Sequence, residues 1–161
     1  MAKFVSKLSK QAPKALYLNI GLLLGFFDCE SYLLRRALIK ILSNIIQKVL
    51  IKDEQTDENT TRIYLMTKMK FLELLMKRFL DKSSYCRVKV MKVFVKLTEE
   101  NMIPRHMYLE LFSNVIGRFK DQTVLVRKGS LKLFHQMIII FGLIFNVNIK
   151  DGERFLQRNQ I

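Results

Sequence analysis

One pattern of charged and apolar residues occurs three times in the chain and constrains the possible folds more than any other feature. Each copy has an Asp and then, six or seven residues later, Arg-x-x-x-apolar-Lys-apolar-apolar, with Arg35, Arg87 and Arg127 as the arginines. One group of helical solenoids has periods of about 40–47 residues, in which each repeat is built of helices that stack on the next repeat. The spacing from Arg87 to Arg127 falls in that range, and the spacing from Arg35 to Arg87 is somewhat longer. The pattern therefore predicts an array of helix pairs.

The rest of the sequence favours helices of the HEAT type. Only 6 Gly and 2 Pro occur in 161 residues, and 50% of the residues are hydrophobic. Turn-rich folds depend on Gly and Pro, so the composition favours long helices. We predict an all-α HEAT-type α-solenoid of about three antiparallel helix pairs. The predicted outer and inner helices are residues 15–27 with 30–50, 61–80 with 83–100, and 104–119 with 123–145.

Flanking and connecting segments differ from this repeat domain, residues 15–145, in composition. Residues 1–14 form a basic N-terminal segment without the apolar stretch of a signal peptide. Residues 52–61 form an acidic loop, and residues 146–161 a polar C-terminal tail that we expect to fray. The most hydrophobic stretch, residues 137–147, is too short to span a bilayer.

The repeated Asp and Arg residues are interpreted first as structural. Arginine suits bidentate pairing with a carboxylate at a partly buried position. We therefore expect an Asp–Arg ladder that joins adjacent repeats. Its members are Asp28, Arg35, Asp81, Arg87, Asp121 and Arg127.

The repeated lysines are the better candidates for function. Lysine and arginine outnumber the acidic residues 28 to 14, which gives a net charge of +14 and favours a polyanionic partner such as nucleic acid. Equivalent lysines on stacked helices should line up and could follow a phosphate backbone without reading bases. An ordinary solvated face in a lysine-rich chain is the alternative. The candidate DNA-binding residues are Arg36, Lys40, Lys89, Lys92, Lys96, Lys128 and Lys132.

Catalytic and metal-binding patterns are missing from the sequence. It has no phosphate-binding loop, no His/Cys cluster and no nucleophile placed beside a base. His106 and His135 are isolated, and we expect Cys29 and Cys86 to be reduced core thiols, which indicates a reducing compartment. The sequence therefore predicts a protein that is not an enzyme, with no metal, cofactor or small-molecule substrate.

Three stretches of the chain resemble the condensin complex subunit 1 family, the HEAT-repeat regulatory subunits of condensin. Each stretch has two parts, and their order and spacing fit the family. They are residues 19–24 (NIGLLL) with 29–37 (CESYLLRRA), residues 84–90 (SYCRVKV) with 101–104 (NMIP), and residues 116–121 (IGRFKD) with 126–128 (VRK).

This resemblance implies an α-solenoid that binds the kleisin subunit, contacts the SMC ATPase heads and DNA, and acts in mitotic chromosome condensation. It also implies a location in the nucleus and on chromosomes, with a cytoplasmic pool possible. Family members are many times longer, so the chain could be a truncated gene model, a split gene or an expressed fragment.

Two other functions are compatible with the sequence. The first is a HEAT adaptor for protein–protein interaction without direct DNA binding, in which the acidic residues 53–58 form a second contact or mask the basic face. The second is a membrane-surface protein that uses the basic N-terminus and the apolar residues 137–147. We do not expect this second function, and the predicted partners include no membrane.

Overall fold

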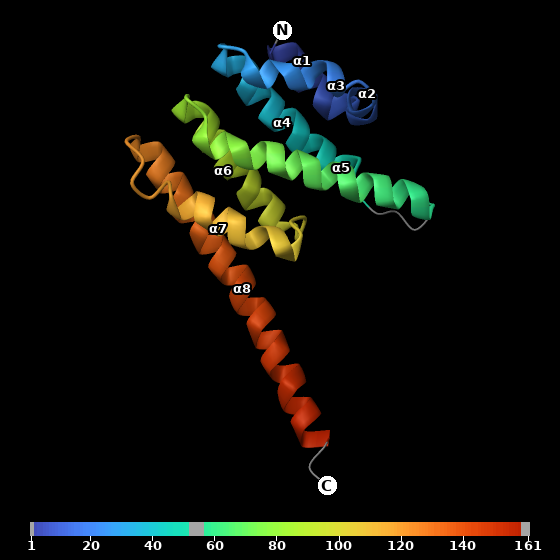
Figure 1. Cartoon of the computed structure of the whole chain (residues 1–161), viewed down its shortest axis with the longest axis vertical. Coiled ribbons are helices and arrows are strands. Elements are labelled where there is room, and N and C mark those ends of the chain that lie inside the picture. The colour runs from blue at the N-terminus through green and yellow to red at the C-terminus, as the bar shows by residue number, and fades with distance from the viewer. Residues whose placement is uncertain (1, 52–56, 159–161) are drawn as a thin grey trace.

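The computed structural model describes residues 2–51 and 57–158 (Figure 1). Every regular element in that part of the chain is helical. The helices stack as pairs into an elongated array, with the N-terminus at one end and the C-terminus at the other (Figure 1). The predicted all-α solenoid is therefore confirmed.

Each repeat has one outer and one inner part. The inner helices are α4 (Tyr32–Lys48), α6 (Ser84–Glu99) and α8 (Val124–Arg158). The first outer part consists of α2 (Pro13–Leu18), α3 (Gly21–Leu24) and the 3-10 helix η1 (Gly25–Asp28). The second consists of α5 (Glu58–Lys77) and η2 (Arg78–Leu80), and the third of η3 (Arg105–Met107) and α7 (Tyr108–Ile116).

The inner helices form a continuous row that also includes α1 (Ala2–Gln11). Helix α1 packs on α4, α4 on α6, and α6 on α8. Asn44 donates a hydrogen bond to the hydroxyl of Ser9 at 2.8 Å, and Lys48 donates to the carbonyl of Lys10 at 3.2 Å. The basic N-terminal segment thus takes the position of an inner helix, which its composition did not predict.

The core runs along this row because the inner helices are apolar on more than one side. Ile39, Ile46, Met91 and Phe94 are all buried between neighbouring helices, and the ring of Phe94 packs against Phe79 of η2 with centroids 5.4 Å apart. Each fully buried side chain of this size contributes about 1.5–3 kcal/mol relative to its exposed state. A single pair could not cover both sides of its inner helix, so the repeats are stable only as a stack.

The first outer helix differs from the prediction of one helix over residues 15–27. It breaks at Asn19 and Ile20, where the Asn19 side chain donates to the carbonyl of Ala15 at 3.0 Å. Asparagine and the following Gly21 and Gly25 are poor helix formers. The result is three short pieces, α2, α3 and η1.

Two other predicted boundaries also shift. Helix α5 begins at Glu58, inside the predicted acidic loop, because the Asp57 carboxylate caps it by accepting the Thr60 amide at 3.0 Å. Residues 52–56 of that loop lie outside the described residues. Helix α8 passes the predicted end at residue 145 and continues to Arg158, and its C-terminal part projects beyond the other helices (Figure 1).

Candidate functional site

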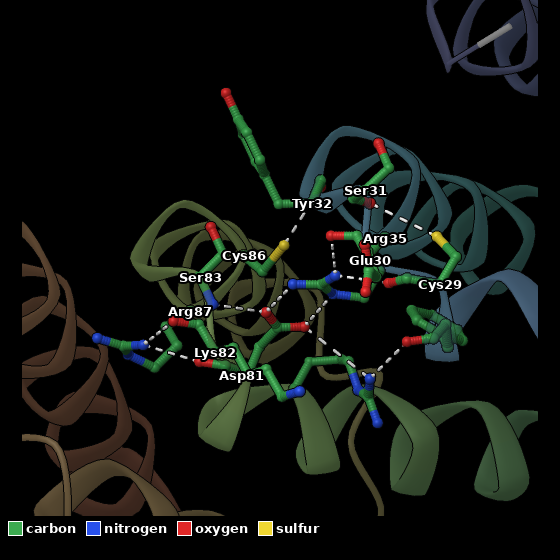
Figure 2. A network of polar contacts seen from close by, with 12 residues as sticks. Cys29, Glu30, Ser31, Tyr32, Arg35, Asp81, Lys82, Ser83, Cys86 and Arg87 are labelled. Atoms are coloured by element: carbon green, nitrogen blue, oxygen red, sulfur yellow. Dashed lines mark hydrogen bonds and ion pairs between the residues drawn. The ribbon is translucent and has the colours of Figure 1, made fainter.

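Arg35 joins the first repeat to the second through a buried contact. Its Nε and Nη2 donate to the two carboxylate oxygens of Asp81 at 2.9 and 2.8 Å, while Nη1 donates to the carbonyls of Cys29 and Glu30 at 2.7 and 2.8 Å. Figure 2 shows the guanidinium between these two sets of acceptors. The Arg35 and Asp81 side chains are 8% and 1% exposed. The pair therefore lies inside the interface between the repeats.

Arg87 repeats the arrangement one unit further along. Its Nη1 donates to the carbonyls of Asp81 and Lys82 at 2.7 and 3.2 Å (Figure 2), and its Nη2 donates to Asp121 Oδ1 at 2.9 Å. The arginine of one repeat thus pairs with the aspartate of the next. The predicted pairing between adjacent repeats is present at Arg35–Asp81 and at Arg87–Asp121.

Both aspartates are held by the same local turn. Asp81 Oδ1 accepts the Ser83 amide at 2.9 Å, and Asp121 Oδ1 accepts the Thr123 amide at 3.0 Å. Burial alone would raise the pKa of Asp81, but the hydrogen bonds from Arg35 and the Ser83 amide outweigh it, so this pKa lies below its ordinary value. The pKa of Asp121 is lowered in the same way, against burial, by Arg87 and the Thr123 amide. Both carboxylates are therefore ionised at neutral pH.

The predicted place of Asp28 in the ladder is wrong. Asp28 is exposed and makes no ion pair with any described residue. The arginine Nη1 contacts define the register: Arg35 binds the Cys29 carbonyl where Arg87 binds that of Asp81. Cys29 therefore occupies the position that aspartate has in the later repeats. The seven-residue spacing from Asp28 to Arg35, against six in the other copies, was the signal of this shift.

A basic groove crosses the inner helices. It encloses about 810 Å³ and is lined by side chains from α1, α4, α6 and α8. Six of the seven predicted DNA-binding residues line it: Lys40, Lys89, Lys92, Lys96, Lys128 and Lys132. Lys10 of α1 also lines the groove, and the sequence did not predict this because α1 was not assigned to the helix row. Four stacked helices thus contribute lysines to one concavity.

Lys89 lies at the centre of this charge cluster. Burial lowers the pKa of Lys89, and the neighbouring charges of Lys40, Arg36, Lys92 and Lys96 lower it further. Burial likewise lowers the pKa of Lys40, with additional repulsion from Lys10 and Arg36. A bound anion would offset both effects, so the groove favours negatively charged ligands.

Arg36 is the predicted residue that lies apart from the groove lining. It is exposed on α4, yet its charge acts on both Lys40 and Lys89, so it extends the same positive potential. The groove lining also contains Val88, Val93 and Leu125. The lining therefore combines lysines with apolar side chains.

Other chemical features of the described residues are few. No group of His, Cys, Asp and Glu in residues 2–51 and 57–158 has the arrangement of a metal site. In the same part of the chain, no helix has the length and hydropathy needed to cross a membrane. Burial raises the pKa of the Cys86 thiol to about 11, which makes it a poor nucleophile.

The chain is similar to subunits of condensin complexes. It is 33% identical over 138 residues to condensin-1 complex subunit CAP-D2 of Arabidopsis thaliana and 32% identical over 138 residues to condensin complex subunit 1 of Schizosaccharomyces pombe. These matches cover 86% of the chain and 10% and 12% of the relatives. The Mus musculus condensin complex subunit 1 is 27% identical over 132 residues, which are 82% of the chain and 9% of that relative.

No protein-family model matches the chain. The chain spans about a tenth of the length of the curated relatives that it matches. The resemblance to condensin complex subunit 1 predicted from the sequence is nevertheless confirmed, and it concerns one segment of about three repeats.

Proposed function

We propose that the chain is a non-enzymatic scaffold segment of a condensin HEAT-repeat subunit and that its basic groove binds the backbone of double-stranded DNA. In this proposal it works with SMC and kleisin subunits on nuclear chromosomes during mitotic condensation. The similarity to condensin subunits supports the assembly. The chemistry of the groove supports the DNA contact.

The groove carries the proposal because each of four successive helices brings at least one lysine to it. Backbone phosphates follow one another at regular intervals, so a row of lysines along a stack can contact several of them without base-specific hydrogen bonds. Lys89 and Lys40 are partly desolvated and repelled by their neighbours in the free protein. Phosphates that enter the groove would reduce that repulsion, which adds to the favourable release of counterions from DNA.

The test is a salt titration of binding to a fluorescent duplex of arbitrary sequence. Each phosphate that the protein neutralises contributes about −0.9 to the slope of log K against log salt. Charge reversal of Lys40, Lys92 and Lys132 to Glu, one lysine from each of three inner helices, should therefore weaken binding and reduce the magnitude of the slope by about 3.

A matched control variant has the same net charge as the groove variant but leaves the groove lysines unchanged. Lys77, Lys82 and Lys120 are exposed and lie outside the groove lining. Their change to Glu alters the net charge as much as the groove variant does. Equal affinities of the two triple variants, with equal helicity by circular dichroism, would show that the groove is not the DNA site.

A second candidate is a protein-interaction module that binds an acidic peptide in the same groove. The apolar side chains of Val88, Val93 and Leu125 in the groove lining favour this alternative. A fluorescent peptide that alternates Glu and Leu would test it in the same assay. If that peptide binds more tightly than the duplex at physiological salt, the adaptor function replaces DNA binding.

A further inference from the structure

Two exposed tyrosines form a stack at one end of the inner helices. Tyr32 is the first residue of α4, and Tyr85 is the second residue of α6. Their ring centroids lie 5.4 Å apart with 24° between the ring planes, yet Tyr32 and Tyr85 remain 39% and 56% exposed. Figure 2 shows the side chain of Tyr32 pointing away from the buried contacts of Arg35. Because a stack covers only one face of each ring, and both residues are exposed, aromatic surface remains for a further planar group.

Tyr85 lies on the groove side of α6. Lys89 and Lys92 line the groove, and they follow Tyr85 by four and seven residues. This spacing places all three side chains on one face of a helix. In the next repeat the equivalent position, two residues before the ladder arginine, is occupied by Leu125, which lines the groove itself. The aromatic end of α6 is therefore continuous with the basic groove.

Tyr32 has the same relation to the groove on α4. It precedes the groove residue Lys40 by eight residues, and Arg36 lies halfway between them. The spacing of four residues again places neighbouring side chains on one side of the helix. Arg36 is exposed, and its charge acts on both Lys40 and Lys89. Arg36 therefore extends the positive charge of the groove lysines to the tyrosine stack.

We propose that the Tyr32–Tyr85 stack is a platform for unpaired bases, and that the basic groove together with this platform binds single-stranded DNA. Proteins that bind single strands combine a basic groove, which follows the phosphates, with aromatic side chains on which bases stack. In a duplex each base is already stacked between its neighbours, so the tyrosines have no base to contact. This proposal rests on the proposed function, since the groove lysines hold the phosphates in both cases. It adds the class of DNA that the site prefers.

The spacing of aromatic and basic side chains matches the parts of a nucleotide. A nucleotide carries its base and its phosphate on one sugar. On both helices a basic side chain, Arg36 or Lys89, follows the tyrosine by four residues, and such positions lie about 6 Å apart. A base that stacks on the ring therefore leaves its phosphate within reach of a long basic side chain. An acidic peptide would pair with the lysines but has no need of the aromatic surface.

The test compares binding of the whole chain to a labelled oligothymidylate of about 20 nucleotides and to a duplex of the same length. Loss of one stacked base lowers affinity by about 5- to 150-fold. Tyr85→Leu is compatible with the fold, because exposed leucines occupy the equivalent positions, Leu33 and Leu125. It should weaken oligothymidylate binding at least about fivefold and duplex binding less than about twofold. Tyr85→Phe is the matched control, since it keeps the ring and should keep the affinity for both.

Tyrosine emission gives a readout that a purely structural role would not change. The chain has 5 tyrosines and no tryptophan, so this emission can be observed directly. Oligothymidylate should quench it more strongly than the duplex does. The double variant Tyr32→Phe/Tyr85→Phe should still bind oligothymidylate but lose the quenching. Its emission comes from tyrosines of the outer helices α2, α5 and α7, which are Tyr17, Tyr64 and Tyr108.

Three results would overturn the proposal. Duplex binding as tight as oligothymidylate binding, or equal effects of Tyr85→Leu and Tyr85→Phe, would remove the platform and leave the groove as a duplex site. Absence of binding to either DNA would overturn the proposed function and the platform with it. Binding of the peptide that alternates Glu and Leu, if it is tighter than that of oligothymidylate and weakened by Tyr85→Leu, would assign the tyrosines to a protein partner.

Discussion

Asp81 and Asp28 look equivalent in the repeated sequence pattern, but the structure predicts opposite consequences when they are replaced. The Asp81 side chain is 1% exposed and accepts hydrogen bonds from Arg35 Nε, Arg35 Nη2 and the Ser83 amide. Asp28 is exposed and makes no ion pair with a described residue. A comparison of Asp81→Ala with Asp28→Ala therefore measures the contribution of the buried ion pair against an exposed aspartate of the same pattern.

The expected magnitude follows from what Asp81→Ala leaves behind. The Arg35 guanidinium remains buried and keeps only its two carbonyl acceptors, and the Ser83 amide loses its partner. Removal of one partner of a buried ion pair typically costs about 3–5 kcal/mol. For a chain of this size, 1 kcal/mol shifts the melting temperature by about 2–4 °C, so the melting temperature should fall by about 6–20 °C. Asp28→Ala should change the free energy of unfolding by less than about 0.5 kcal/mol.

The assay is urea and thermal unfolding followed by circular dichroism at 222 nm. The double variant Arg35→Ala/Asp81→Ala gives the coupling between the two side chains and should be less destabilised than the sum of the single variants. Equal effects of Asp28→Ala and Asp81→Ala would refute the conclusion that the buried pair with Arg35 distinguishes the two aspartates. A cost below about 1 kcal/mol for Asp81→Ala would show that the pair is solvated like a surface ion pair.

The structure makes three other predictions. The pKa of Asp81 is lowered in the folded state, so the contribution of Asp81 to stability is present above about pH 4 and is lost as the pH falls through that lowered pKa. The urea midpoint of Asp81→Ala should therefore depend less steeply on pH below about 4 than that of the unchanged chain. Parallel plots of urea midpoint against pH for the two chains would contradict this. Lys89→Met should raise the melting temperature, because it removes a charge that is partly desolvated and repelled by its neighbours. The same variant should reduce the magnitude of the salt slope of DNA binding by about 0.9. A lower melting temperature would contradict the expected gain in stability. Gly142→Ala should stabilise α8 by up to about 1 kcal/mol, because open space surrounds Gly142 and alanine favours the helix. Gly129→Ala should give no gain, because its methyl group would lie 3.0 Å from Met91 Sδ. Equal gains of the two variants in urea unfolding would contradict the close contact at Gly129.

The sequence alone determined the class of the fold and most of the basic residues that line the candidate groove. The recurrence of the charged pattern at Arg35, Arg87 and Arg127 predicted stacked helix pairs. The lysine that follows each of these arginines within the pattern predicted one basic surface, and all three lysines lie in the groove. The helix pairs and the alignment of these lysines depend on the repeat of residue types along the chain, which can be read from the sequence.

The tertiary structure decided the register and the ends of the array. The choice of Cys29 over Asp28 as the equivalent of Asp81 depends on which backbone carbonyls the arginine reaches, and the sequence pattern does not specify those distances. The contribution of Lys10 depends on the packing of α1 against α4, two helices that are separated in the sequence by the whole first outer part. That Arg127 has no ion-pair partner among the described residues likewise becomes visible only in the stack. Pairing between repeats depends on distances between residues far apart in the chain, so only the packed helices determine it.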